Sequence, residues 1–213
     1  MSGSREPMLA SVRAALGPAT EVPEVPRAYL QAGAQGAGGD SLTADLFCQR
    51  VADYQATVKR VSDDDLPDAL KFACEQRGAH RLAVAAQAPP WTVGGVELVR
   101  DDPPLSPRQL DDLDGVLSGC ALAIAETGTI VLDGVGPSGR RALTLVPDYH
   151  LCVVRAQDIV RSVPDCVAAL ARVAADRQPI TMISGPSATV DIELVRVNGV
   201  HGPRILDVFV VEA

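Results

Sequence analysis

The pattern of apolar and polar positions changes its period several times along the chain, as in a domain that alternates strands with helices. Helical spacing of apolar residues predicts helices over residues 5–16, 41–53, 65–77, 107–113, 164–177 and 189–195. Alternating or short apolar runs predict strands over residues 54–61, 81–86, 96–100, 116–132, 149–155, 179–184 and 205–211. This order favours an α/β domain of three layers, with a mixed, mostly parallel sheet and helices on both faces.

Two finer predictions concern how these elements meet. The strand, helix and strand over residues 54–86 imply a right-handed crossover and a parallel strand pair. Residues 116–132 are apolar on both sides of Glu126-Thr127-Gly128, which predicts an antiparallel turn and makes the sheet mixed. Helical spacing also places three large apolar residues on faces that we expect to be buried: Leu42, Phe72 and Val167.

The first forty residues differ from the rest. Gly17 and Pro18 end the first helix, and residues 17–40 are rich in Pro, Gly and Ala. We therefore expect a helix with an extended arm over residues 1–40 and one globular domain over residues 41–213.

Composition excludes several classes of protein. The net charge is -8, only two residues are lysines and aromatic residues make up 3% of the chain, which argues against nucleic-acid binding. No apolar run approaches the roughly 18 residues of a membrane span, and no secretory signal is visible at the start. We expect a cytoplasmic protein without a membrane span.

The usual cofactor motifs are missing from the positions where they would indicate a cofactor. The sequence has no GxGxxG directly after its first strand, no GxxxxGK[ST] and no clustered cysteines, so we expect the chain to bind no cofactor and no metal by itself. The five cysteines are widely spaced, which favours free, mostly buried thiols.

One polar segment lies between two apolar runs. Glu126 could act as a nucleophile or base, with the hydroxyls of Thr127 and Thr129 orienting an oxygenated ligand, because open α/β sheets bind ligands near the carboxyl ends of their strands. The alternative is a plain hairpin, with Gly128 in a left-handed conformation and Glu126 in solvent.

A second polar segment spans residues 184–193, where Gly185 is predicted to lie in a loop before a helix. Backbone N–H groups at that helix start, with Ser187 and Thr189, could bind an anion. Asp191 and Glu193 could instead complement the helix dipole and would then repel an anion.

The loop over residues 199–204 adds two more candidates. His201 lies between glycines in an exposed loop or a cleft, and Arg204 could bind an anion or pair with Asp191 or Glu193. Arg140 and Arg141 form a further anion-binding candidate, with a surface role as the alternative.

Three segments together resemble the LUD-domain family and, within it, the lactate-utilisation protein C group. They are residues 124–132, 184–193 and 199–204, and the similarity covers residues 40–213. The resemblance implies a NagB/RpiA/CoA transferase-like fold, shared with ribose-phosphate isomerase and the cyclo-ligases of formyltetrahydrofolate. It implies no settled catalytic residue.

The resemblance also implies a function: oxidation of L-lactate to pyruvate in bacteria, together with iron–sulfur partner proteins. Two alternatives stay open, a stand-alone enzyme of the CoA-transferase or cyclo-ligase kind with Glu126 as nucleophile, and a module that binds a small carboxylate or phosphate. In each case we expect the candidates to converge on one cleft at the ends of the central strands: Glu126, Thr127, Ser187, Thr189, Asp191 and His201.

Overall fold

The computed structural model describes residues 4–17, 24–32, 38, 40–190 and 196–212. The chain divides into two compact units, Met1–Leu30 and Gln31–Ala213. The first unit contains α1 (Arg5–Leu16), which matches the prediction, and none of its side chains is buried. All remaining elements belong to the second unit.

A sheet of six parallel strands is the centre of the second unit. Its order is β1 (Thr57–Ser62), β12 (Ile205–Glu212), β7 (Tyr149–Arg155), β4 (Gly115–Ser118), β2 (Arg81–Val84) and β3 (Glu97–Arg100). β1 and β2 run parallel, as expected, but the predicted pairing was wrong, because β12, β7 and β4 lie between them. β7 and β12 are buried over most of their length, as expected for interior strands of a parallel sheet.

A second, smaller sheet contains the predicted antiparallel turn. Its order is β8 (Ile159–Val160), β5 (Leu122–Ile124), β6 (Thr129–Leu132) and β9 (Thr181–Ile183). Gly128 has φ +60° in the turn between β5 and β6, and a Cβ there would lie 2.7 Å from the backbone carbonyl carbon of Arg50. The turn is confirmed, but it makes this second sheet mixed and leaves the large sheet fully parallel.

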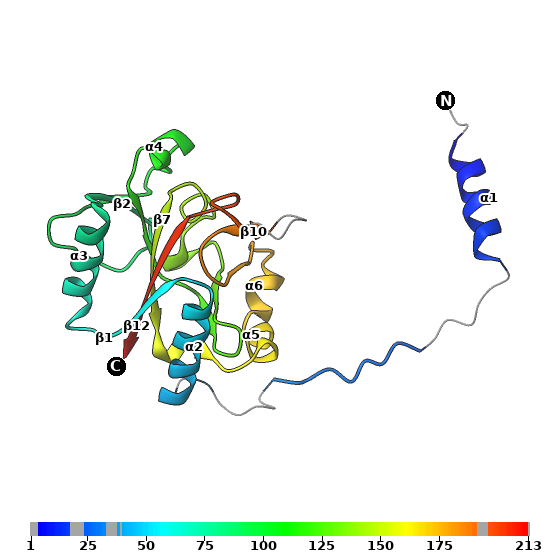
Figure 1. Cartoon of the computed structure of the whole chain (residues 1–213), viewed down its shortest axis with the longest axis horizontal. Coiled ribbons are helices and arrows are strands. Elements are labelled where there is room, and N and C mark those ends of the chain that lie inside the picture. The colour runs from blue at the N-terminus through cyan, green and yellow to red at the C-terminus, as the bar shows by residue number, and fades with distance from the viewer. Residues whose placement is uncertain (1–3, 18–23, 33–37, 39, 191–195, 213) are drawn as a thin grey trace. The chain divides into compact units, whose positions relative to one another are not determined.

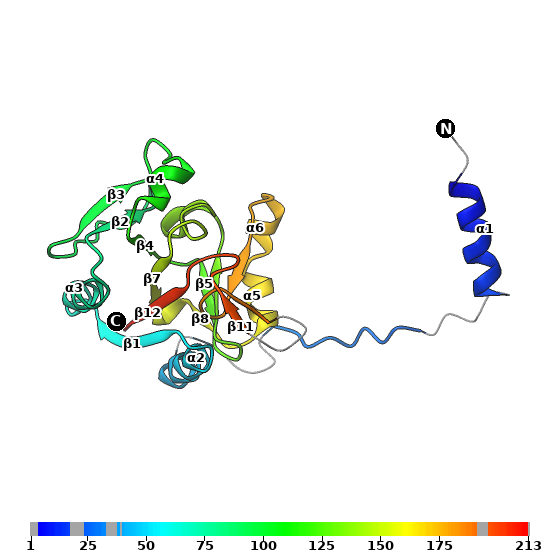
Figure 2. The ribbon, with the colours of Figure 1, turned by 45° about the horizontal axis from the view of Figure 1, so that its top comes forward.

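The two sheets and their helices form layers (Figures 1 and 2). α3 (Leu66–Arg77) covers one face of the large sheet with Leu70 and Cys74. The opposite face packs against α2 (Ser41–Asp53), through Phe47, and against the small sheet. α5 (Val163–Ala169) and α6 (Ala171–Ala175) lie between β8 and β9 in the chain, and Cys166 and Leu170 pack against the outer face of the small sheet. The α/β class is confirmed, with a second sheet in place of part of the expected helical layer.

Local signals fixed several element ends. Ser106 forms a capping box with Gln109 at the start of α4 (Pro107–Asp111), and Gly78 ends α3 with φ +64°. Short 3-10 turns lie at Gly136–Ser138 and Ala156–Asp158. No helix in the described ranges is long and apolar enough to cross a membrane.

Other local predictions were wrong. The helix expected near residues 189–195 begins instead as β10 (Ala188–Val190), which pairs antiparallel with β11 (Arg196–Asn198); residues 191–195 lie outside the described part. The β-branched Thr189 and Val190 favour a strand there. Leu42, Phe72 and Val167 are exposed, because helical spacing does not say which apolar residues of a helix reach the core.

Candidate functional site

A cavity of about 440 Å³ opens at the amino ends of β7 and β12, and we call it the Arg141 cavity. His150, the second residue of β7, and Leu206, the second residue of β12, are both buried and line it. β9 and the loop after it supply further lining, as do residues 201–203 and the segment before β7. The cavity therefore lies between the amino ends of these strands of the large sheet and β9 of the small sheet.

The polar lining of the Arg141 cavity is basic or neutral. It consists of Arg141, Thr144, His150, Thr181, Ser184, Ser187 and His201. None of the described lining residues carries a carboxylate. A bound anion would therefore meet donors and no like charge.

Arg141 is the cation of this cavity. Its Nη1 donates to the carbonyl oxygen of Thr144 at 2.9 Å and to the hydroxyl at 3.0 Å, and it forms no ion pair with the residues that the structure describes. Burial lowers the pKa of its guanidinium. Because a partly buried charge without a counter-ion is unfavourable, a ligand anion at Arg141 would be stabilised.

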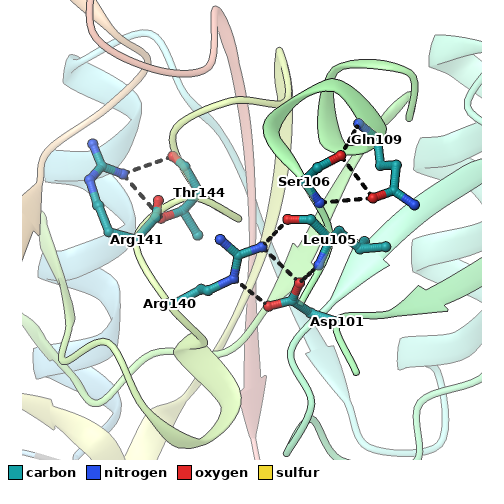
Figure 3. Close-up of polar contacts among 7 residues, drawn as sticks. All are labelled: Asp101, Leu105, Ser106, Gln109, Arg140, Arg141 and Thr144. Atoms are coloured by element: carbon teal, nitrogen blue, oxygen red, sulfur yellow. Dashed lines mark hydrogen bonds and ion pairs between the residues drawn. The ribbon is translucent and has the colours of Figure 1, made fainter. Parts of the chain in front are cut away.

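The preceding residue, Arg140, has a different environment (Figure 3). Its Nε and Nη2 donate to the two carboxylate oxygens of Asp101 at 2.7 and 2.9 Å, and Nη2 also reaches the carbonyl oxygen of Leu105. Burial raises the pKa of Asp101, but hydrogen bonds from Arg140 and from the Leu105 N–H outweigh it and hold that pKa below its usual value. Figure 3 shows the two arginines pointing apart, so Arg140 holds the loop and Arg141 faces the cavity.

His150 is only 1% exposed, and a hydrogen bond with the buried Ser118 orients its ring. Its Nε2 lies 2.7 Å from the Ser118 hydroxyl, which itself donates to the carbonyl oxygen of Gly119 at 2.9 Å. The Ser118 hydroxyl therefore links the imidazole of His150 to the backbone of Gly119 and holds the ring in place.

Two buried thiols lie near His150. A hydrogen bond from Cys120, with smaller contributions from His150 and Ser118, lowers the pKa of the Cys152 thiol below its usual value, although burial opposes this. The pKa of Cys120 rises well above its usual value because Cys120 donates to Cys152 and is buried. Neither thiol lines the cavity, so a ligand there meets the imidazole of His150 rather than sulfur.

Sequence analysis predicted part of this cavity. Ser187 and His201 both line it, and the Ser187 hydroxyl accepts a hydrogen bond from the His201 N–H at 2.9 Å. Gly185 lines it too, with φ +114°, and a Cβ there would lie 2.7 Å from the Tyr54 Cβ. The expected helix start is absent from residues 188–190, which form a strand, so the helix-dipole argument for this segment was wrong.

The segment around Glu126 lies beside the cavity. The hydroxyls of Thr127 and Thr129 are 2.7 Å apart, and that of Thr129 is 2.7 Å from Ser184, which lines the cavity. Glu126 is not a lining residue; its Oε1 accepts a hydrogen bond from the Val163 N–H at the start of α5. This contact gives Glu126 a helix-capping role, while its catalytic role stays a prediction.

The remaining candidates have other positions. Thr189 is exposed on β10 and does not line the cavity. The Nε of Arg204 donates to both carboxylate oxygens of Asp148, at 2.7 and 2.9 Å. Asp191 and Glu193 lie outside the described residues.

Two polar residues of the cavity, Arg141 and His150, were hardly or not at all indicated as site residues by the sequence. Arg141 was one of two adjacent arginines that the sequence could not tell apart. His150 had a usable signal, because alternation along Tyr149–Arg155 puts it on one face with Cys152, inside an otherwise apolar strand. Within the described ranges, no three His, Cys, Asp or Glu residues could together hold a metal ion.

Known proteins match this chain over most of its length. Residues 106–211 match the LUD domain. The lactate utilization protein C of Deinococcus radiodurans is 51% identical over 166 residues, covering 78% of this chain and 77% of that protein. The chain therefore belongs to the LUD-domain family.

Two further relatives refine the comparison. The uncharacterized protein YkgG of Escherichia coli is 29% identical over 174 residues, covering 75% of each chain. The crystal structure of a DUF162 family protein from Deinococcus radiodurans superposes with a TM-score of 0.69 at 42% identity, covering 80% of this chain and 97% of that one. The α/β fold is thus shared with a solved relative.

Proposed function

We propose that the chain is a component of a bacterial L-lactate utilisation system, which oxidises lactate to pyruvate together with iron–sulfur partner proteins. Its part in that system is to bind an anion, a small carboxylate or a phosphate-bearing ligand, in the Arg141 cavity. The chain acts in the cytoplasm and holds no cofactor of its own.

One structural observation carries the binding role: Arg141 faces a cavity whose described lining contains no carboxylate. A guanidinium in that setting suits a planar carboxylate or a phosphate. The name of the 51% identical relative supports the system in which the role is exercised. An accessory role also fits the sequence, because removing two electrons from lactate needs a cofactor, and the chain has no P-loop and no clustered cysteines. The glycines of residues 134–139 have the spacing GxGxxG, but they lead into a 3-10 turn and not into the helix that a dinucleotide site requires.

The alternative is a stand-alone CoA-transferase-like or cyclo-ligase-like enzyme with Glu126 as nucleophile. No contact favours it, since Glu126 caps α5 and does not line the cavity. The relation of the fold to CoA transferases stays a prediction from the resemblance.

Growth on L-lactate tests the proposal in a bacterium from which this chain has been deleted. The intact chain should restore growth, and Arg141→Gln should not. Arg204→Gln is the matched control, because Arg204 is an exposed arginine paired with Asp148 outside the lining, and it should restore growth. All strains should grow on pyruvate. Full growth with Arg141→Gln would contradict the binding role.

The accessory role has a second test with purified protein. The chain alone should be colourless and should not reduce an artificial electron acceptor with lactate; activity should appear after the iron–sulfur partners are added. Flavin or iron–sulfur absorbance in the visible spectrum, or turnover without partners, would contradict it.

A further inference from the structure

The size of the Arg141 cavity bears on what it holds. Its volume is about 440 Å³. Cavities of about 300–1,000 Å³ in proteins hold drug-sized ligands and cofactors, and a three-carbon acid is several times smaller. Lactate alone would leave most of the space to water.

The lining is divided in a way that suits a larger molecule. Arg141 and its Thr144 partner supply the charged end. Tyr54, Met182 and Leu206 supply an apolar wall, together with prolines of the adjoining loops. Tyr54 is 48% exposed and Met182 is 49% exposed, so both retain apolar surface that a ligand could cover.

We propose that the Arg141 cavity binds an organic anion larger than lactate, whose carboxylate or phosphate group pairs with Arg141 and whose apolar body lies along Tyr54, Met182 and Leu206. This inference rests on the proposed function only for the anion at Arg141. It adds the chemical class of the ligand and excludes lactate as the molecule that fills the cavity.

Calorimetric titration with two series of compounds tests the inference. The first series keeps a 2-hydroxy acid group and lengthens the body: lactate, hydroxybutyrate, hydroxyhexanoate and phenyllactate. The second keeps a phosphate: inorganic phosphate, propyl phosphate and phenyl phosphate. Affinity should rise about threefold to fourfold for each methylene that enters the cavity, while the better series identifies the charged group.

Variants separate the two ends of the site. Arg141→Gln should weaken every member of the better series by a similar factor. Met182→Ser should reduce the gain with length and leave the shortest member unchanged. Val167→Ser is the matched control, because Val167 is an exposed apolar residue of α5 outside the lining. It should change neither the affinity of the shortest ligand nor the gain in affinity with ligand length.

The outcomes distinguish this inference from the proposed function. Equal affinity for lactate and for its longer analogues, all lost in Arg141→Gln, would overturn the inference and leave anion binding intact. If affinity still rose with ligand length in both Arg141→Gln and Met182→Ser, the apolar body of the ligand would lie elsewhere, and the inference would also be overturned. No binding by any member of either series would overturn both the inference and the proposed binding role.

Discussion

Two cavities of similar size lie at opposite ends of the same central strands. The Arg141 cavity, of about 440 Å³, is at the amino ends of β7 and β12, and a second, of about 490 Å³, is at their carboxyl ends. The second, which we call the Arg60 cavity, is lined by Arg60, Arg155, Asp63 and Glu212 among others. Both of its arginines are paired.

The difference between the cavities lies in charge compensation. Arg60 binds Asp45 and Glu212, and Arg155 binds Asp63, so an anion entering that cavity would have to displace carboxylates. At Arg141 an anion would supply a counter-ion that the described residues do not. Parallel sheets commonly bind ligands at the carboxyl ends of their strands. Here Arg141, which has no ion pair among the described residues, favours the opposite, amino ends of the strands.

The largest expected effect separates the two arginines directly. Arg141→Gln should lower the affinity for phenyllactate or phenyl phosphate by about 10-fold to 100-fold, the value of one or two charge-assisted hydrogen bonds. Arg60→Gln should leave that affinity unchanged. Calorimetric titration of both variants checks this, and an equal loss in both would remove the distinction between the cavities.

The loop that carries Arg141 depends on the Asp101–Arg140 pair, which gives a pH dependence. Because the folded-state pKa of Asp101 lies below its ordinary value of 3.8, the pair stabilises the fold at neutral pH and this contribution fades as the pH falls below that value. Asp101→Asn should cost about 2 kcal/mol at pH 7, and the gap to the intact chain should be smaller at an acidic pH below 3.8. Denaturant unfolding at both pH values measures it; a gap independent of pH would show that the ion pair contributes nothing.

A smaller effect should follow when the Arg141 cavity is given an acidic group like those of the Arg60 cavity. Met182→Glu places a carboxylate in the lining and should weaken anion binding about fivefold, in line with about 1 kcal/mol for an exposed charge pair. Met182→Gln introduces a side chain of the same size as glutamate but without the charge, and it serves as the control. Equal affinities for the two variants would show that lining charge does not govern this site.

The smallest expected effect is a gain of function. Asp45→Asn with Glu212→Gln leaves Arg60 without its two carboxylates and should give the Arg60 cavity weak phosphate affinity, with a Kd of about 1 mM. Stability should fall by at most about 2 kcal/mol, because a surface ion pair contributes at most about 1 kcal/mol and two such pairs are removed. Phosphate titration followed by NMR shifts at Arg60 measures the gain, and no shift would mean that pairing is not what keeps anions out.

The sequence predicted the elements better than their arrangement. Capping by Ser106, the stop at Gly78 and the turn at Gly128 depend on neighbouring residues, so local patterns predict them. The separation of β1 from β2 depends on which strands carry enough apolar surface for the centre of the sheet. That competition involves the whole chain and leaves no local signal.

The candidate site shows the same division. Ser187 and His201 belong to loops with unusual composition, and both line the cavity. The choice between Arg140 and Arg141 is made by Asp101, far away in sequence, which binds one arginine and leaves the other to the cavity. Residue type alone cannot make that choice.

The place of β12 has a consequence for how the chain is made. Thr57 of β1 pairs with Asp207 of β12, and β12 is the strand next to β1 at that edge of the large sheet. β1 therefore has no partner strand until β12, much later in the chain, has been synthesised. Pairing over such sequence separations is slow, and unpaired strands are prone to associate wrongly in the meantime. The strands β3, β2, β4 and β7 can pair with one another before that, so we expect β1 to join the described sheet last.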